Sequence, residues 1–167
     1  MDKKFFLQIK EATAADVPHL VQLVKRLAEY EKLENQMVAT EELFKRYGFG
    51  EYSYYKALLA QTEEEMGYRY IGFALYFFTF STFLGKPTLY LEDLFVLPEF
   101  RGRGVGKQLL KQLAQIALQR ECGRMEWSVL NWNESAIHFY VELGAKAMEE
   151  WILYRLHLPE IEKLALS

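Results

Sequence analysis

The sequence predicts an α/β or α+β fold, with helices flanking one mixed central sheet, in a single domain that spans residues 1–167. Three observations support this prediction. The chain has 167 residues, half of them hydrophobic, which favours one substantial core and leaves little room for a second. Short apolar segments typical of strands are mixed along the chain with longer segments of helical periodicity. No internal repeat, linker or low-complexity tract separates them.

The first third of the chain is expected to contain one strand and two helices. A strand is predicted over 5–12, and an amphipathic helix follows it to about Glu31. Thr13 and Asp16 have the spacing of a helix cap. The apolar positions of this helix recur every three or four residues: Val17, Leu20, Val21, Val24, Leu27 and Ala28. A second, shorter helix is predicted over 41–48.

The middle of the chain is expected to form three strands. Strands are predicted over 54–61 and 68–80, with the charged segment 62–67 as the hairpin turn between them. The second of these strands is dense in aromatic residues, which favour sheets. A third strand is predicted over 88–97, where Pro98 ends it.

The last third alternates helices and strands again. An apolar stripe at helical spacing predicts a helix over 105–121. A strand over 125–130 and a helix over 133–143, ended by Gly144, are expected next. The alternating segment 145–158 predicts one or two closing strands.

Composition excludes several classes of protein. Twenty basic against 23 acidic residues give a net charge of −3, too little positive charge for a general nucleic-acid binder. The apolar segment 71–84 is too short to span a membrane, and MDKKFFLQIK has no apolar run long enough for a signal peptide. The single cysteine, Cys122, cannot form an internal disulfide. We therefore expect a cytoplasmic protein that binds neither nucleic acid nor membrane.

The segment RGRGVGKQLL (101–110) is the most informative short motif. A P-loop requires glycine at the place of Arg101 and Ser or Thr at the place of Gln108, so that pattern fails twice. The dinucleotide pattern G-x-G-x-x-G fails because the third glycine comes one residue early. The pattern Arg-x-x-Gly-x-Gly remains, and an ordinary glycine-rich turn stays open as an alternative.

Physical chemistry favours an anion at this loop. Gly104 and Gly106 expose backbone N–H groups, and the N-terminus of the following helix carries partial positive charge. Arg101 and Lys107 add to that field. The loop is therefore predicted to bind phosphate groups.

Two further residues are candidates for chemistry. Glu92 lies in the middle of an apolar strand, where an unpaired buried carboxylate is costly; a pair with a nearby Lys or Arg is the alternative. Asp93 is its neighbour and is expected on the opposite face of the strand. Tyr140 lies seven residues after Asn133, which puts both on one face of a helix. A core aromatic residue is the alternative for Tyr140.

Several stretches resemble one protein family. YLEDLFVLPEFRGRGVGKQLL is similar to the coenzyme-A strand, loop and helix of the GNAT superfamily of N-acetyltransferases, and NWNESAIHFYVELGA (131–145) is similar to that family's next segment. ATAADVPHLVQLVKRLAEYE, GFGEYSYY and YLEDLFV most resemble its diamine (spermidine/spermine) N-acetyltransferases and their thialysine-acetylating relatives. The resemblance covers nearly the whole chain.

This resemblance implies a splayed sheet that binds acetyl-CoA as co-substrate. Pantetheine would hydrogen-bond like an extra strand between two diverging strands, with the pyrophosphate over 102–107. The cofactor-binding residues implied are Leu94, Phe95, Val96, Arg101, Gly102, Arg103, Gly104, Val105, Gly106, Lys107, Asn133, Ser135 and Tyr140. No metal is expected, because His19, His138 and His157 lack metal-ligand spacing.

The resemblance also implies the roles of the candidate catalytic residues. Glu92 would bind the amine and serve as base through water, and Tyr140 would be the general acid that protonates the departing thiolate. The implied substrate-binding residues are Glu31, Glu92, Asp93 and Glu150.

The expected acceptor is a small-molecule primary amine, a diamine, polyamine or lysine-like amino acid, and the expected assembly is a homodimer. The polyamine enzyme has an aspartate at the place of Thr82 and a tryptophan at the place of Leu84, so short amines are expected to be better substrates than spermine. Protein or peptide N-acetylation, a non-catalytic acetyl-CoA sensor and an unrelated phosphate-binding module are the alternatives.

Overall fold

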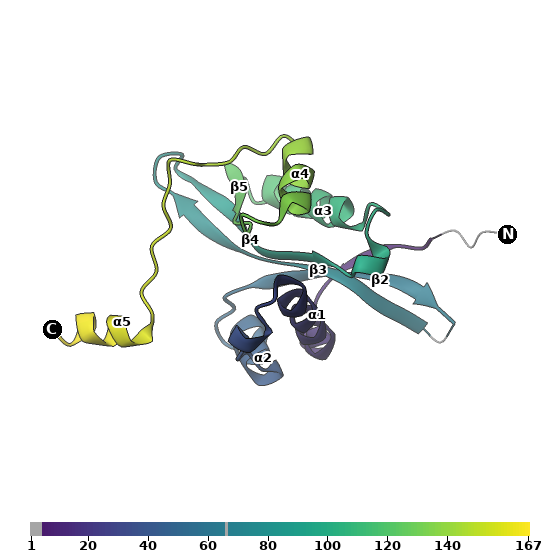
Figure 1. Cartoon of the computed structure of the whole chain (residues 1–167), viewed down its shortest axis with the longest axis horizontal. Helices are drawn as coiled ribbons and strands as arrows, with labels where there is room; N and C mark the ends of the chain where they lie inside the picture. Colours follow the sequence, from purple (N-terminus) through teal and green to yellow (C-terminus); the bar gives the residue numbers. More distant parts are fainter. Residues whose placement is uncertain (1–4, 66) are drawn as a thin grey trace. The chain divides into compact units, whose positions relative to one another are not determined.

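The computed structural model describes residues 5–65 and 67–167 (Figure 1). The chain divides into two compact units, Met1–Ser128 and Val129–Ser167. The prediction of one domain over 1–167 stays a prediction. Met66, in the predicted hairpin turn, lies outside the described residues.

The first unit is built on one mixed sheet. Its strands are β1 (Gln8–Glu11), β2 (Lys56–Glu64), β3 (Gly67–Ser81), β4 (Lys86–Val96) and β5 (Arg124–Trp127). They lie in the order β1-β2-β3-β4-β5. The first four are antiparallel to their neighbours, whereas β5 runs parallel to β4. The mixed sheet predicted from the sequence is confirmed.

Helices cover both faces of this sheet. Figure 1 shows α1 (Val17–Glu31) and α2 (Glu41–Phe49) on one side and α3 (Val105–Gln119) on the other. Short 3-10 turns precede α1 (Ala14–Asp16), follow it (Glu34–Gln36) and follow β4 (Pro98–Phe100).

The core of the first unit follows the predicted apolar stripes. On α1 the buried residues are Val17, Leu20, Val21, Leu23 and Leu27, and on α3 they are Val105, Leu109, Leu110, Leu113 and Ala117. The spacing of three and four puts each set on one helix face. Between the helices the sheet contributes fully buried Leu59, Ile71, Phe73, Leu89 and Leu91.

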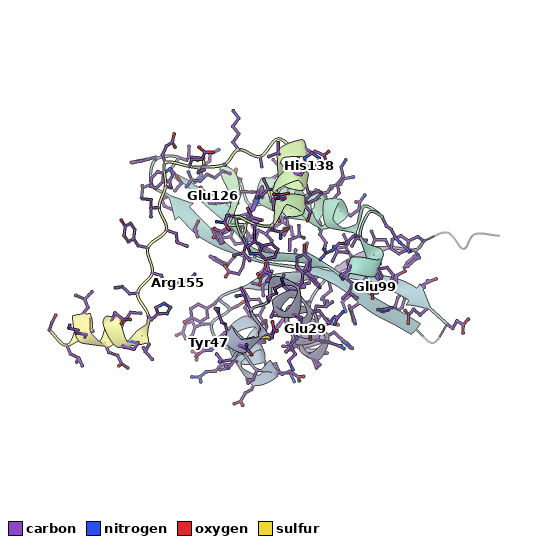
Figure 2. All side chains as sticks on the ribbon, in the orientation of Figure 1. Glu29, Tyr47, Glu99, Glu126, His138 and Arg155 are labelled. Atoms are coloured by element: carbon purple, nitrogen blue, oxygen red, sulfur yellow. The ribbon has the colours of Figure 1, made fainter. Side chains whose placement is uncertain are left out.

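The second unit contains two helices, α4 (Glu134–Glu142) and α5 (Leu158–Ala165). The helix predicted over 133–143 is confirmed as α4. His138, labelled in Figure 2, lies on this helix, and its Nε2 is 3.2 Å from Oε1 of Glu142. The closing strands predicted over 145–158 are wrong. Residues 145–157 form no strand, and a helix begins at Leu158.

The reason for this error is physical. Alternating apolar residues give a segment one apolar face, but a strand also needs a neighbour that completes its ladder of hydrogen bonds. At its end the segment carries helix signals instead, with Pro159 in the first turn, Glu160 beside the helix N-terminus and Lys163 in the last turn.

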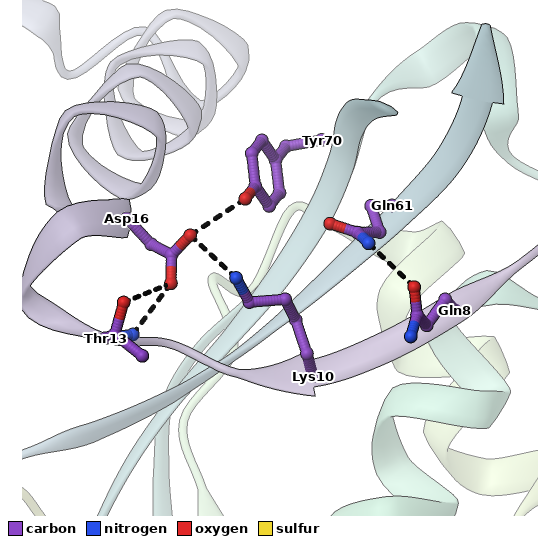
Figure 3. A network of polar contacts seen from close by, with 6 residues as sticks. All are labelled: Gln8, Lys10, Thr13, Asp16, Gln61 and Tyr70. Atoms are coloured by element: carbon purple, nitrogen blue, oxygen red, sulfur yellow. Dashed lines mark hydrogen bonds and ion pairs between the residues drawn. The ribbon is translucent and has the colours of Figure 1, made fainter. Parts of the chain in front are cut away.

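A buried carboxylate joins the start of α1 to the sheet (Figure 3). One oxygen of Asp16 accepts hydrogen bonds from the backbone N–H of Thr13 at 2.8 Å and from its hydroxyl at 2.7 Å. The other accepts from Lys10 Nζ and from the Tyr70 hydroxyl, each at 2.8 Å. Burial opposes ionisation of Asp16, but these hydrogen bonds outweigh it and hold its pKa well below the usual range. The helix cap predicted at Thr13 and Asp16 therefore extends into the sheet.

We expect Asp16→Asn to lower the free energy of unfolding at pH 7 by roughly 2–4 kcal/mol, because the variant loses charge-assisted hydrogen bonds at a buried site. The contribution of a carboxyl with a lowered pKa is present above its unfolded pKa, near 3.9, and is lost as pH falls below it. Urea unfolding of both proteins should therefore give stabilities that converge as pH is lowered from about 5 towards 2.

Glu29→Gln is the matched control. Glu29 pairs with Arg26 at 2.7 Å, but both side chains are half exposed, and such pairs contribute at most about 1 kcal/mol. A loss for Asp16→Asn as small as that of the control at pH 7 would contradict the structural role of Asp16.

Candidate functional site

The glycine loop lies between the end of β4 and the start of α3. Gly102 and Gly104 have φ angles of 72° and 79°, in the left-handed region that favours glycine, and Gly104 is the N-cap of α3. A Cβ atom built on either glycine would meet no neighbouring atom within 4 Å. The chain therefore needs glycine here for its backbone conformation and not for packing space.

The loop leaves backbone donors at the helix N-terminus. The first helical hydrogen bond of α3 runs from Gln108 N–H to the Gly104 carbonyl at 3.0 Å. The N–H groups of Val105, Gly106 and Lys107 precede that ladder, so they have no carbonyl acceptor within the helix. A 15-residue helix with such donors at its positive end is suited to a phosphate group. The exposed ammonium of Lys107 adds a full charge.

The two arginines of the loop have a further role that the sequence did not reveal. Arg101 Nε donates to the Val96 carbonyl at 3.0 Å, and its guanidinium lies 4.2 Å from the ring centre of Tyr30 on α1 and 5.6 Å from that of Phe95. Arg101 thus connects the loop, the end of β4 and the end of α1. Arg103 lies over two other rings, Phe5 at 5.2 Å and Phe100 at 5.5 Å.

A β-bulge lies at Glu92. In the β3–β4 ladder Leu75 pairs with Asp93 and Tyr76 pairs with Leu91, so Glu92 is an extra residue on β4. The expectation that Glu92 and Asp93 lie on opposite faces assumed regular alternation, and the bulge removes that basis. Glu92 is exposed, whereas Asp93 is half-buried.

Three carboxyl groups lie close to this bulge. Burial, and then the charges of Glu92 and Glu31, raise the pKa of Asp93 to about 7. Burial also raises the pKa of Glu31, the last residue of α1. The structure thus brings together Glu31, Glu92 and Asp93, three of the four predicted substrate-binding residues, from two separate elements.

The parallel ladder between β4 and β5 ends at the same place. Its last pair is Leu91 with Trp127, immediately before the bulge. Beyond it, Leu94, Phe95 and Val96 pair with β3 on one edge only, within the described residues. Apart from the Val96 carbonyl, which accepts from Arg101, the backbone groups on their other edge are available to an extended ligand that binds like an added strand.

The remaining candidates lie in the second unit. Asn133 is the N-cap of α4, and its Oδ1 accepts from Ala136 N–H at 3.3 Å and from the Ser135 hydroxyl at 3.2 Å. Tyr140 lies in the last turn of α4, partly buried, with its ring centre 5.4 Å from that of Phe139. Glu150 is exposed in the turn that follows. The sequence carries the signal for this capping role, an asparagine directly before a helical segment, although Asn133 was predicted only as a cofactor-binding residue.

A comparison of the sequence with models of protein families identifies the family of this chain. The model described as the acetyltransferase (GNAT) family matches residues 21–145, most of the chain and parts of both units. The chain belongs to the GNAT family.

Individual GNAT relatives match over the whole length of the chain. Thialysine N-epsilon-acetyltransferase of Bos taurus is 37% identical over 167 residues, covering 96% of this chain and 98% of that protein. Spermidine/spermine N(1)-acetyltransferase-like protein 1 of Homo sapiens is 35% identical over 166 residues, covering 96% of this chain but 24% of that longer protein. The subfamily resemblance seen in the sequence agrees with these relatives.

Solved structures show the same fold as this GNAT chain. The integron cassette protein VCH_CASS6 from the mobile metagenome of V. cholerae superposes with a TM-score of 0.78 at 32% identity, covering 96% of this chain and 98% of that chain. The aminoglycoside N-acetyltransferase AAC(6')-Iy, solved in complex with CoA, gives 0.72 at 22% identity, covering 94% and 99%. The predicted GNAT fold is confirmed, and the chain is an acetyl-CoA-dependent N-acetyltransferase.

The described part of this GNAT chain has neither a candidate metal cluster nor a candidate membrane span. Among residues 5–65 and 67–167, no three His, Cys, Asp or Glu side chains are grouped so that they could hold a metal ion. Across the same residues, no helix combines the length and apolarity needed to cross a bilayer.

Proposed function

We propose that the protein acetylates a primary amine of a small cationic molecule, a diamine or a lysine-like amino acid. The observation that carries this proposal is the group of three carboxyls, Glu31, Glu92 and Asp93, at the bulge of the strand that leads into the glycine loop. Carboxylates attract an ammonium group and can accept its proton. The names of the relatives, a thialysine N-epsilon-acetyltransferase and a spermidine/spermine N(1)-acetyltransferase-like protein, support the same class of acceptor.

Acetyl-CoA is proposed to bind along β4 and at the loop. The pyrophosphate would accept hydrogen bonds from the N–H groups of Val105, Gly106 and Lys107, and the pantetheine amides would pair with the free edge of Leu94–Val96. From the resemblance, Asn133 and Ser135 are also proposed as cofactor-binding residues.

Two protons must move during the reaction. An alkylammonium with a pKa near 10.4 is about 0.04% neutral at pH 7, which is equivalent to roughly 4.6 kcal/mol. In our proposal Glu92 takes that proton through a water molecule, and the neutral nitrogen attacks the thioester carbonyl. As the C–S bond breaks, Tyr140 protonates the departing thiolate. The nitrogen loses its second proton as the amide forms, and that proton, passed through water, restores the Tyr140 hydroxyl. Backbone N–H groups at the carbonyl would stabilise the oxyanion.

Thr82 and Leu84, at the end of the β3–β4 hairpin, favour short acceptors. Neither side chain offers a charge to a long polycation. One missing charge-assisted contact costs roughly 1.5–3 kcal/mol, about ten- to a hundredfold in affinity. A thiol-release assay with acetyl-CoA and a panel of amines should therefore rank diamines, lysine and thialysine above spermine. A panel led by spermine would contradict this selectivity, and acetylation confined to protein N-termini would overturn the small-amine assignment.

We also propose that the protein is a cytoplasmic homodimer. The single cysteine supports a reducing compartment, and burial raises the pKa of its thiol, which favours a structural role. The homodimer is proposed mainly from the resemblance to the diamine acetyltransferases; the aromatic residues along β3 add only weak support, because a buried sheet needs no partner chain. Sedimentation at micromolar concentration that found only a 19.7 kDa species would exclude the dimer.

Gly104→Val should weaken acetyl-CoA binding by about ten- to a hundredfold, because a branched side chain would stand where phosphate oxygens approach the backbone donors. Isothermal calorimetry with coenzyme A measures the change. Gly67→Val is the control, since Gly67 also has a positive φ, of 125°, and open space around it. Equal affinities for the two variants would remove the loop from the cofactor site.

A further inference from the structure

The last turn of α1 faces the end of β4 through two adjacent residues. The ring centre of Tyr30 lies 6.2 Å from that of Phe95. Glu31, the next residue, lies close enough to Asp93 for its charge to raise the pKa of that carboxyl. Asp93 and Phe95 are two positions apart on β4, beyond the bulge, so their side chains lie on the same face of the sheet. An aromatic pair therefore lies beside the pair of carboxyls proposed to meet the acceptor.

Arg101 joins this aromatic pair to the glycine loop. Its guanidinium carbon lies over the ring of Tyr30, 4.2 Å from the ring centre, and 5.6 Å from the ring centre of Phe95. Its Nε donates to the Val96 carbonyl at 3.0 Å. The hydrogen bond orients the planar guanidinium, and the cation–π contacts hold it against the rings. Tyr30, Phe95 and Arg101 together form the Arg101 cluster, which connects the loop to the last turn of α1.

Glu31 lies at a helix end, where the backbone is least restrained. It is the last residue of α1, and Lys32 follows as the C-cap with a φ of 59°, in the left-handed region where helices commonly end. Helix ends fray unless tertiary contacts hold them. The residue before Glu31 supplies such a contact, because the Tyr30 ring packs against Phe95 and Arg101. The place of the Glu31 carboxyl therefore depends on the Arg101 cluster.

We propose that Arg101 and Tyr30 are positioning residues for the acceptor, which hold the Glu31 carboxyl beside Asp93 where a cationic amine binds. A guanidinium has five N–H donors and two flat faces. Arg101 can therefore donate to a phosphate through its terminal nitrogens while one face lies on the Tyr30 ring. Tyr30 serves the acceptor side alone. This inference rests on the proposed function, and it gives an arginine of the phosphate loop a second role, in binding the acceptor.

Tyr30→Leu should raise the KM for a diamine by about three- to thirtyfold, the range expected when one cation–π contact is lost. Its kcat and its affinity for coenzyme A should stay unchanged, because Tyr30 touches neither the reacting atoms nor the phosphate loop's donors. Tyr30→Phe keeps the ring and should keep the KM of the unaltered enzyme. Initial rates at saturating acetyl-CoA give kcat and KM, and calorimetry with coenzyme A gives the cofactor affinity.

Arg101→Met tests whether the two residues act together. It removes the cation from the Tyr30 ring and from the phosphate loop, so it should weaken coenzyme A binding and also raise the diamine KM at saturating acetyl-CoA. That rise should again be about three- to thirtyfold. In the double variant, Tyr30→Leu should add no further rise in KM, because the contact that it removes is already lost. Residues that acted independently would multiply their effects on KM.

Tyr47→Leu is the matched control. Arg46 lies over the Tyr47 ring at 5.3 Å, but both residues belong to α2, so this variant should leave the diamine KM and the coenzyme A affinity unchanged. Circular dichroism should show that all variants are folded. An unchanged diamine KM in Tyr30→Leu or in Arg101→Met would overturn the inference while the proposed function stands. Equal losses for Tyr30→Phe and Tyr30→Leu, or multiplied effects in the double variant, would do the same. An unaltered protein that acetylates no amine would overturn both.

Discussion

Tyr140→Phe is expected to lower kcat by roughly two to four orders of magnitude while leaving acetyl-CoA binding nearly unchanged. The variant keeps the ring and loses only the hydroxyl that we propose protonates the coenzyme A thiolate, and positioned general acids contribute about this much. The backbone of Tyr140 takes part in the hydrogen bonds that end α4. Its carbonyl accepts from Leu143 N–H and Ala145 N–H, each at 3.1 Å, as α4 ends.

Thiol release under saturating substrates measures the effect, and calorimetry with coenzyme A measures cofactor affinity. Tyr52→Phe is the matched control, because Tyr52 is an exposed tyrosine of the first unit and should keep full turnover. If Tyr140→Phe turned over as fast as the control, Tyr140 would not be the general acid. It would then be a core aromatic residue, which is the alternative that the sequence left open.

The sequence predicted most of the fold because the relevant signals are local. The helices α1 and α3 follow apolar stripes whose residues are the buried ones in the structure. The segment from β4 into α3 was predicted from a strand that ends at Pro98, from the glycine spacing of the loop and from the apolar stripe of the helix. The positive φ angles of Gly102 and Gly104 give the physical reason for the two loop glycines.

What the sequence could not predict depends on residues far apart in the chain. The extra residue at Glu92 exists only through the register between β3 and β4, since the letters YLEDLFV show no break in a strand pattern. The contact between Arg101 and Tyr30 joins positions on different elements. Segment 145–157 has a strand pattern in the sequence but forms no strand in the structure, because no neighbouring strand completes a ladder of hydrogen bonds with it.

Glu92→Gln and Asp93→Asn are expected to separate the roles of two adjacent carboxyls. Glu92→Gln removes the proposed base and should lower kcat/KM for a diamine by roughly 10²–10⁴ at pH 7. That deficit should shrink as pH approaches the pKa of the amine, near 10.4, because the acceptor then arrives already neutral.

Asp93→Asn should behave differently because the Asp93 carboxyl, with a pKa of about 7, is mostly protonated below neutral pH. Above pH 7 its charge helps to hold the cationic acceptor, so the variant should raise KM about ten- to a hundredfold there, with little change in kcat. Below pH 6 the variant and the unaltered enzyme should have similar KM values.

Asp93→Asn is expected to change the free energy of unfolding in the opposite direction to Asp16→Asn. A raised carboxyl pKa means that the folded state binds the proton more tightly, so the unaltered protein loses stability as pH rises from about 4 to 7. Asp93→Asn has no such ionisation and should therefore be more stable at pH 8, by roughly a few kcal/mol, and nearly equal at pH 4. Urea unfolding at the two pH values, together with kcat and KM from pH 6 to 10, measures both effects. Equal losses of kcat for the two variants at every pH would show that Glu92 is not the specific base, and an Asp93→Asn protein no more stable at pH 8 would contradict the burial of that charge.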